Sequence, residues 1–153
     1  METRIKQPEL AIETTAMFQN LFQKEGTYGI DELMAQLTSK LRRSFLVFKH
    51  NKYFTIPVEN IAYFYVKYGN STIVCMDRSE YLVNYSLDQI QALLNGRQFY
   101  RINRQCLINF SAVKEVEHYF ARKLLVTLII TTAEKLLVPK EKARLFLDWL
   151  ENR

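Results

Sequence analysis

Short runs of apolar and β-branched residues, most of them separated by only two or three residues, extend from Phe45 to Val138. The runs are FLVFKH, YFTIPV, IAYFYVKY, TIVCMD, EYLVNY, VKEVEHYF, KLLVTLII and LLV. Runs that recur every 8–12 residues or so are typical of strands in a β sandwich or barrel. Because short connections favour antiparallel neighbours, we predict a mostly β fold with about eight to ten strands in an antiparallel meander.

A single helix is expected between these strands. In Ser86-Leu87-Asp88-Gln89, a hydroxyl stands three residues before a glutamine, which is the pattern of a capping box at a helix start. Asn95-Gly96 is a typical helix end. The apolar face predicted for this helix consists of Leu87, Ile90, Leu93 and Leu94.

A second helix is predicted at the C-terminus. Pro139 can start it, because the first turn of a helix does not use that N–H group. Trp149 is expected at the flank of this helix. The residues predicted to face inward are Ala143, Phe146, Leu147 and Leu150.

Residues 1–41 differ in pattern from the rest and are predicted to be helical. Residues 10–23 have apolar side chains at helical spacings, and Asp31 is a plausible cap for a second helix after Gly26-Thr27-Tyr28-Gly29. This segment is too short for a core of its own. We therefore expect a linker or docking segment over residues 1–41 and one domain over residues 42–153.

Charge and composition limit the classes of function that the chain can have. Residues 1–40 contain four Lys/Arg and six Asp/Glu, whereas residues 41–153 contain seventeen and ten, so the larger part carries the positive charge. Such a distribution is typical of proteins that bind nucleic acid. The sequence shows no signal-peptide pattern and no apolar run long enough for a membrane helix, so we expect a cytoplasmic protein without a membrane partner.

No constellation for catalysis is visible, and the chain is not expected to be an enzyme. Cys75 and Cys106 are isolated in apolar runs and are predicted to be buried. His50 and His118 lack the partners of a metal site or a catalytic triad, and no phosphate-binding glycine motif occurs. We expect no catalytic residue, metal or cofactor.

The segment FYRINRQCLINF, residues 99–110, combines a strand-like apolar pattern with long hydrogen-bond donors. Its Asn103-Arg104-Gln105 has the side chains that contact base edges, but it could equally be a network that caps strand ends. Lys67 to Ser71 is a second polar strand tip, for which an ordinary hairpin turn is the alternative. Lys140-Glu141-Lys142 lies at a predicted helix start, where N–H groups suit a phosphate, and a solvated first turn is the alternative.

These segments, in this order, resemble the LytTR family, the DNA-binding domain of many bacterial response regulators. FYRINRQCLIN is similar to the family signature F-x-R-x-H/N-R-S/Q-x-L-V/I-N. VENIAYFYV, SLDQIQALL and LLVPKEKARLFLDWL resemble the family's entry to the first reading loop, its internal helix and its closing strand and helix. NRQ and HYFARKLLVTL resemble the versions in Bacteroidetes-type regulators. The resemblance covers residues 42–153.

The resemblance implies an elongated stack of small antiparallel sheets whose loops enter successive major grooves of bent duplex DNA. It places the first reading loop at residues 67–72, a second element at residues 138–142, and the signature against the DNA backbone and groove. The DNA-binding residues implied are Lys67, Tyr68, Asn70, Ser71, Arg101, Asn103, Arg104, Gln105, Pro139, Lys140 and Lys142.

Three departures from the family leave the DNA sequence open. Tyr65 stands where the family has a glutamate, Asn103 replaces a frequent histidine, and Pro139-Lys140 replaces Ser-Arg. Proline cannot donate a hydrogen bond, and lysine lacks the guanidinium fork.

The resemblance also implies partners. They are double-stranded DNA with a direct-repeat or paired site, and a phosphorylated receiver domain in cis if the chain is a fragment of a two-component regulator. A stand-alone regulator that dimerises through its N-terminal helices is the other reading. Two alternative functions stay open: a single-strand or RNA binder that stacks bases on Tyr63, Tyr65 and Tyr68, and a protein-interaction module that docks through residues 1–41.

Overall fold

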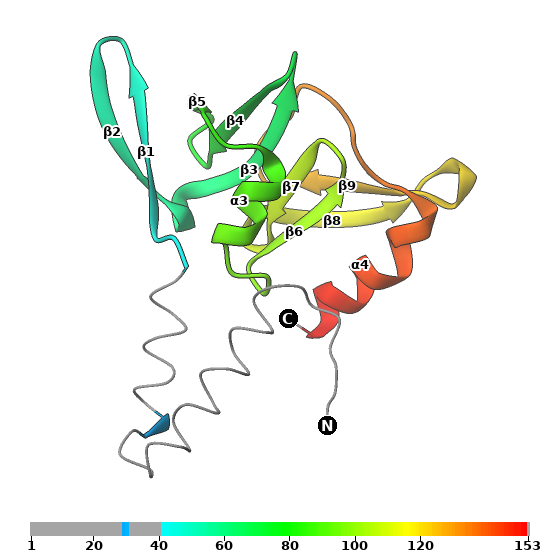
Figure 1. The fold of residues 1–153 in the computed structure, drawn as a ribbon. Helices are drawn as coiled ribbons and strands as arrows, with labels where there is room; N and C mark the ends of the chain where they lie inside the picture. The colour runs from blue at the N-terminus through cyan, green and yellow to red at the C-terminus, as the bar shows by residue number, and fades with distance from the viewer. Residues whose placement is uncertain (1–28, 31–40, 153) are drawn as a thin grey trace. The chain divides into compact units, whose positions relative to one another are not determined.

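The computed structural model describes residues 29–30 and 41–152 of the chain. The residues from Arg42 onward form one compact unit. Figure 1 shows the arrangement of its strands and helices. The helices predicted in residues 1–40 lie outside the described residues, so the linker role of residues 1–41 stays a prediction.

Within the described part of this unit, ten strands form three antiparallel sheets. The strands are β1 (Ser44–Lys49), β2 (Lys52–Pro57), β3 (Ile61–Lys67), β4 (Asn70–Cys75), β5 (Glu80–Val83), β6 (Phe99–Asn103), β7 (Cys106–Asn109), β8 (Val113–His118), β9 (Leu124–Leu128) and β10 (Leu136–Val138). The helices are α3 (Leu87–Leu93) and α4 (Lys140–Asn152), and the 3-10 turns are η1 (Val58–Asn60), η2 (Phe110–Ala112) and η3 (Phe120–Arg122). The predicted mostly β fold with an internal and a C-terminal helix is confirmed.

The small antiparallel sheets that the family resemblance implies are confirmed, whereas the strands do not follow one another in a simple meander. β1 and β2 form a separate hairpin, and β8, β9 and β10 form a sheet of three strands. In the central sheet the order is β5-β4-β3-β7-β6, so β7 pairs with β3, at Tyr63↔Ile108 among other positions. The chain reaches that place through α3, which is a longer connection than a hairpin turn.

Both faces of the central sheet are buried over most of its three inner strands, β4, β3 and β7, which explains why these strands are mainly apolar. In β3, Phe64 packs on one side with Phe45 of β1 and Ile90 of α3. Tyr63 packs on the other side with Phe146 of α4 and with the sheet of β8, β9 and β10. The unit therefore has two hydrophobic cores, one on each side of the same sheet.

The start of α3 is fixed by the predicted capping box. The Ser86 hydroxyl accepts a hydrogen bond from the Gln89 backbone N–H at 3.1 Å, and the Gln89 side-chain oxygen accepts one from the Ser86 N–H at 2.9 Å. Leu87 and Ile90 are buried in the core between α3 and the central sheet. Local sequence and tertiary packing thus agree at this helix.

Helix α4 begins at Lys140, one residue after the predicted start. Phe146 is fully buried, whereas Leu147 is 41% exposed, so the prediction that Leu147 faces inward is wrong. Residues 146 and 147 differ by about 100° around a helix, and the core occupies only the Phe146 side. Trp149 closes the other end by donating from Nε1 to the Gly96 carbonyl at 2.8 Å.

Three hairpins end in tight turns with two corner residues at positive φ. The corner pairs are His50-Asn51 between β1 and β2, Tyr68-Gly69 between β3 and β4, and Ala121-Arg122 between β8 and β9. Positive φ at both corners is the feature of the type I′ turn, whose twist matches that of the strands. The gaps between the apolar runs at Asn51-Lys52 and at residues 69–71 each lie about one residue after the observed corner pair, whereas the gap at Ala121-Arg122 coincides with it.

Candidate nucleic-acid interface

The three polar segments predicted to bind DNA lie on one continuous surface. A hollow of about 260 Å³ is lined by Lys67 and Tyr68 of the β3–β4 turn and by Gln105 of the β6–β7 turn. A neighbouring hollow of about 560 Å³ is lined by Arg104 of the β6–β7 turn and by residues of the β10–α4 junction. Since the β6–β7 turn borders both, we call this the turn surface, defined by Lys67, Tyr68, Asn103, Arg104, Gln105, Pro139 and Lys142.

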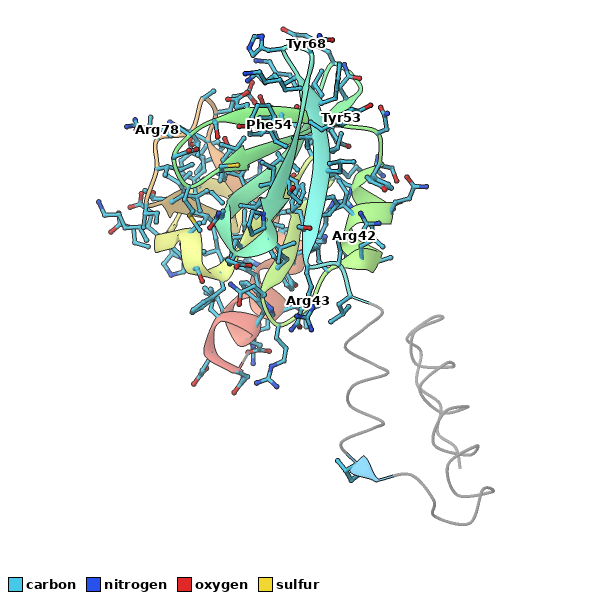
Figure 2. The ribbon with its side chains drawn as sticks, turned by 90° about the vertical axis from the view of Figure 1, so that its left-hand side faces the viewer. Arg42, Arg43, Tyr53, Phe54, Tyr68 and Arg78 are labelled. Carbon is cyan, nitrogen blue, oxygen red and sulfur yellow. The ribbon has the colours of Figure 1, made fainter. Side chains whose placement is uncertain are left out.

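The β3–β4 turn contributes a cation and a phenol. Tyr68 is 91% exposed, and the Lys67 Nζ lies 5.6 Å from the centre of its ring. Figure 2 shows Tyr68 at the end of the unit, beyond the strands. Asn70 is exposed but belongs to β4, and Ser71 is only 5% exposed within the same strand. The assignment of Ser71 to an exposed turn is therefore wrong, because the turn closes at Tyr68-Gly69.

Arg101 donates hydrogen bonds to the backbone of the β6–β7 turn. Its Nε donates to the Asn103 carbonyl at 2.9 Å, and its Nη2 donates to the Arg104 carbonyl at 2.8 Å. Its Nη1 pairs with the Asp88 carboxylate at 2.8 Å, and the Arg101 side chain is only 17% exposed. Arg101 thus uses its donors on the turn backbone and on α3, and it positions the turn instead of facing a ligand.

Asn103 has a similar structural role. Its Nδ2 donates to the Leu137 carbonyl of β10 at 2.8 Å, and its Oδ1 accepts from the Gln105 N–H at 2.8 Å. The Gln105 carbonyl in turn accepts from the Val66 N–H of β3 at 3.0 Å. These bonds join the β6–β7 turn to its neighbours on both sides. The strand-end network that was the alternative for this segment is therefore present at Arg101 and Asn103.

Arg104 and Gln105 form the two-residue corner of this turn, and both side chains are exposed. Among the described residues, Arg104 has no ion-pair partner, in contrast to Arg101. The backbone that carries this guanidinium and this amide is fixed by the hydrogen bonds described above. The turn is therefore pre-organised for a ligand, because its backbone loses little conformational entropy on binding.

The β10–α4 junction adds further positive charge. Lys140 is exposed at the first residue of α4, and Pro139 lies beside Arg104 at the larger hollow. The Lys142 Nζ donates to the Arg101 carbonyl at 3.2 Å, so the start of α4 is tied to β6. Partial burial, and to a lesser degree the charge of Arg101, lower the pKa of Lys142 below its usual range. An anion at this place would raise the pKa of Lys142 again.

Comparisons with known proteins show the family and the fold of this domain. The profile of the LytTr DNA-binding domain family matches residues 51–151. The chain belongs to the LytTR family. The solved LytTr DNA-binding domain of a Bacillus cereus protein, described as a methyl-accepting/DNA response regulator, has the same fold. That match has a TM-score of 0.64 and 17% identity, and it covers 71% of this chain and 97% of the other. No curated protein matches the sequence.

The LytTR match includes every residue of the turn surface, but two basic residues at its hollows were not predicted from the sequence. Lys135, in the loop between β9 and β10, lines the smaller hollow. Lys123, after the β8–β9 turn, lines the larger one. In the sequence Lys123 opens the predicted strand run KLLVTLII and Lys135 precedes the run LLV, and no motif distinguishes them from other surface lysines.

The tyrosines and cysteines of this LytTR domain are mostly structural. Tyr63 is 5% exposed, and burial raises its pKa above the usual range. The Tyr65 hydroxyl donates to Glu80 at 3.4 Å. Cys75 and Cys106 are buried as predicted, and burial raises the pKa of Cys106 to about 12, so it is a poor nucleophile.

Two further observations concern the part of the chain that the structure describes. Its helices are too short or too polar to cross a membrane. Its His, Cys, Asp and Glu side chains form no group of three that could hold a metal ion.

Proposed function

We propose that residues 42–153 bind double-stranded DNA in a sequence-specific manner, as the output domain of a two-component transcription regulator. The observation that supports this most is the exposed Arg104-Gln105 corner, which stands on a rigid base between two other cationic elements. Membership in the LytTR DNA-binding family supports the same partner.

In this proposal the turns of the domain enter successive major grooves. Arg104 is the candidate base-reading residue, because a guanidinium can donate two bonds to one guanine edge. Gln105 suits an adenine edge in the same way. Lys67, Lys140 and Lys142 are assigned to phosphates, which set register without carrying sequence information.

The remaining predicted site residues have supporting roles in the proposal. Tyr68 and Asn70 are exposed at the first tip and are assigned to the DNA backbone. Arg101 and Asn103 are positioning residues, since their donors are used within the protein. Ser71 is buried and has no part in the proposed contact.

Partners beyond the duplex are also proposals. A single domain with few reading side chains covers a short site, so a direct repeat or paired site read by two copies would supply specificity. A receiver domain in cis, or dimerisation through residues 1–41, would bring two copies together. A cytoplasmic location follows from DNA as the partner.

A single-strand or RNA binder has less support from the structure than a duplex binder. That function requires Tyr63, Tyr65 and Tyr68 as a stacking platform. Tyr63 is buried and Tyr65 is half-buried and bonded to Glu80, so only Tyr68 of these three offers an open ring. Docking through the N-terminal helices concerns residues outside the described part of the chain.

The decisive experiment selects bound duplexes from a random library with the full chain and then measures Arg104→Ala on the selected duplex. We expect a loss of about 1–3 kcal/mol in binding free energy and relaxed preference at one base pair. Arg97→Ala is the matched control, because Arg97 is an exposed arginine that precedes β6 at the end opposite the turn.

Failure to select any duplex, or a selected single strand that outcompetes the duplex, would contradict the proposed function. Equal effects of Arg104→Ala and Arg97→Ala would remove Arg104 from the reading role.

A further inference from the structure

The β8–β9 turn is a tight hairpin end close to the turn surface. The Lys123 N–H donates to the Phe120 carbonyl at 3.3 Å, and the Tyr119 N–H donates to the Lys123 carbonyl at 2.9 Å. Ala121 and Arg122 occupy the two corners at φ 61° and 63°. In Figure 1 this turn, drawn in yellow, projects outward past the start of α4.

The corner residues are poor choices for folding alone. Both corners of such a turn need left-handed backbone, for which Asn-Gly is the usual pair. Alanine and arginine have a Cβ that disfavours this conformation. Turn formation therefore does not explain why an arginine occupies this corner, and a contact between its side chain and a ligand explains it better.

An exposed aromatic ring stands next to these cations. Phe120 is 70% exposed and its ring lies 4.7 Å from that of Tyr119, centre to centre. The Lys123 Nζ lies 5.8 Å from the centre of the Phe120 ring. The tip thus offers one apolar face with an ammonium beside it, which suits a sugar–phosphate chain.

The turn is continuous with the turn surface. Lys123 lines the same hollow as Arg104 and Lys142, and among the described residues Glu141 is the one carboxylate in that lining. Three cations against one anion make this hollow attractive to a polyanion that already contacts Arg104.

We propose that the β8–β9 turn is a further DNA contact, in which Arg122 and Lys123 bind phosphates flanking the groove entered by Arg104. The Phe120 ring covers the adjoining sugar. This inference rests on the proposed function and extends the contact beyond the three elements expected from the sequence. Because phosphates carry no sequence information, the turn contributes affinity and register and not base preference.

The test compares Arg122→Gly and Lys123→Gln in the full chain with Lys114→Gln. Glycine suits the positive φ of residue 122, so Arg122→Gly removes the guanidinium and is expected to keep or raise the unfolding temperature. Lys114 is an exposed lysine near the start of β8, away from the turn, and serves as the matched control. Thermal unfolding verifies that each variant is folded.

Affinity is measured on the duplex selected from the random library and on a scrambled duplex of equal length, over about 50–300 mM salt. We expect each turn variant to weaken both duplexes alike, by about three- to tenfold. The log–log salt slope should become shallower by about 0.9 for each phosphate that the variant no longer neutralises. Lys114→Gln should change neither quantity.

The outcomes separate the two proposals. If the unmodified chain binds no duplex, the proposed function itself fails. If it binds but both turn variants match Lys114→Gln in affinity and salt slope, only the β8–β9 contact is overturned. A decrease in affinity confined to the selected duplex would also overturn it, because it would assign the turn to bases and not to phosphates.

Discussion

At the scale of single residues, the two arginines of the signature differ in burial and therefore in role, although their side chains are chemically identical. Arg101 and Arg104 have the same side chain and stand three positions apart. Arg101 is 17% exposed at its side chain and donates to two turn carbonyls and to Asp88. Arg104 is exposed at the corner that Arg101 supports. Arg101 therefore supports the backbone of the turn that presents Arg104.

Arg101→Lys tests this division of roles. Lysine keeps the charge but cannot donate in three directions from a planar fork, so two turn carbonyls lose partners. We expect the free energy of unfolding to fall by about 1–3 kcal/mol in urea denaturation. Duplex affinity should fall as well, because the turn that carries Arg104 loosens.

Arg104→Ala is the comparison in the same denaturation series. Its side chain is exposed, so its unfolding free energy should stay within about 0.5 kcal/mol of the unmodified chain. An Arg101→Lys protein of unchanged stability would refute the positioning role.

At the scale of elements, three hairpins end in turns whose two corner residues both have positive φ. Gly69, at the second corner of the β3–β4 turn, has φ 79° and open space around its α-carbon. Any cost of a side chain there comes from the backbone conformation and not from a clash. The tip that presents Lys67 and Tyr68 thus depends on one glycine.

Gly69→Ala should destabilise the domain by about 1 kcal/mol, as measured by urea unfolding, because alanine disfavours left-handed backbone. Gly96→Ala is the matched control, since Gly96 also has open space around it but its φ lies outside the left-handed region. That variant is expected to be neutral or slightly stabilising. Equal costs at the two sites would show that φ is not the cause.

At the scale of the whole molecule, the excess of positive charge belongs to residues 41–153 and several of its members gather on one surface. Lys67, Arg104 and Lys142 come from three different elements. The exposed Lys140 lies next to Pro139, which shares the larger hollow. Clustered cations of this kind bind duplexes largely by releasing counterions.

This arrangement predicts a steep salt dependence for the full chain. Each neutralised phosphate contributes about −0.9 to the slope of log affinity against log salt, so the three phosphates assigned to Lys67, Lys140 and Lys142 give a slope of about −2.7. Filter binding or fluorescence anisotropy over a salt series measures it, with Arg97→Ala expected to leave the slope unchanged. A slope near zero would mean that the partner is not a polyanion.

Much of the fold follows from sequence pattern, where the rule is local. The capping box at Ser86 and Gln89, the buried Ile90 and the strand character of residues 99–110 all depend on neighbours a few positions away. The turn at Ala121-Arg122 was located correctly, whereas the β1–β2 and β3–β4 turns were one residue off, because aromatic and polar residues such as Tyr68 give no strong local signal for positive φ. Leu147 was placed inward because helical spacing alone does not define how wide the buried stripe is.

The order of residues along the chain was enough to establish the mostly β class, the two helices, the charged part of the chain and the segments that carry polar side chains. These properties depend on periodicity and composition, which are local. Three-dimensional packing was needed to establish that β7 lies beside β3, that Arg101 and Asn103 are used internally while Arg104 can face a ligand, and that Lys123 joins the same surface. Those facts depend on contacts between residues far apart in the sequence. Backbone carbonyls of the turn and of β10 accept hydrogen bonds from Arg101 and Asn103, and the side chains that make no such bond are left to contact a ligand.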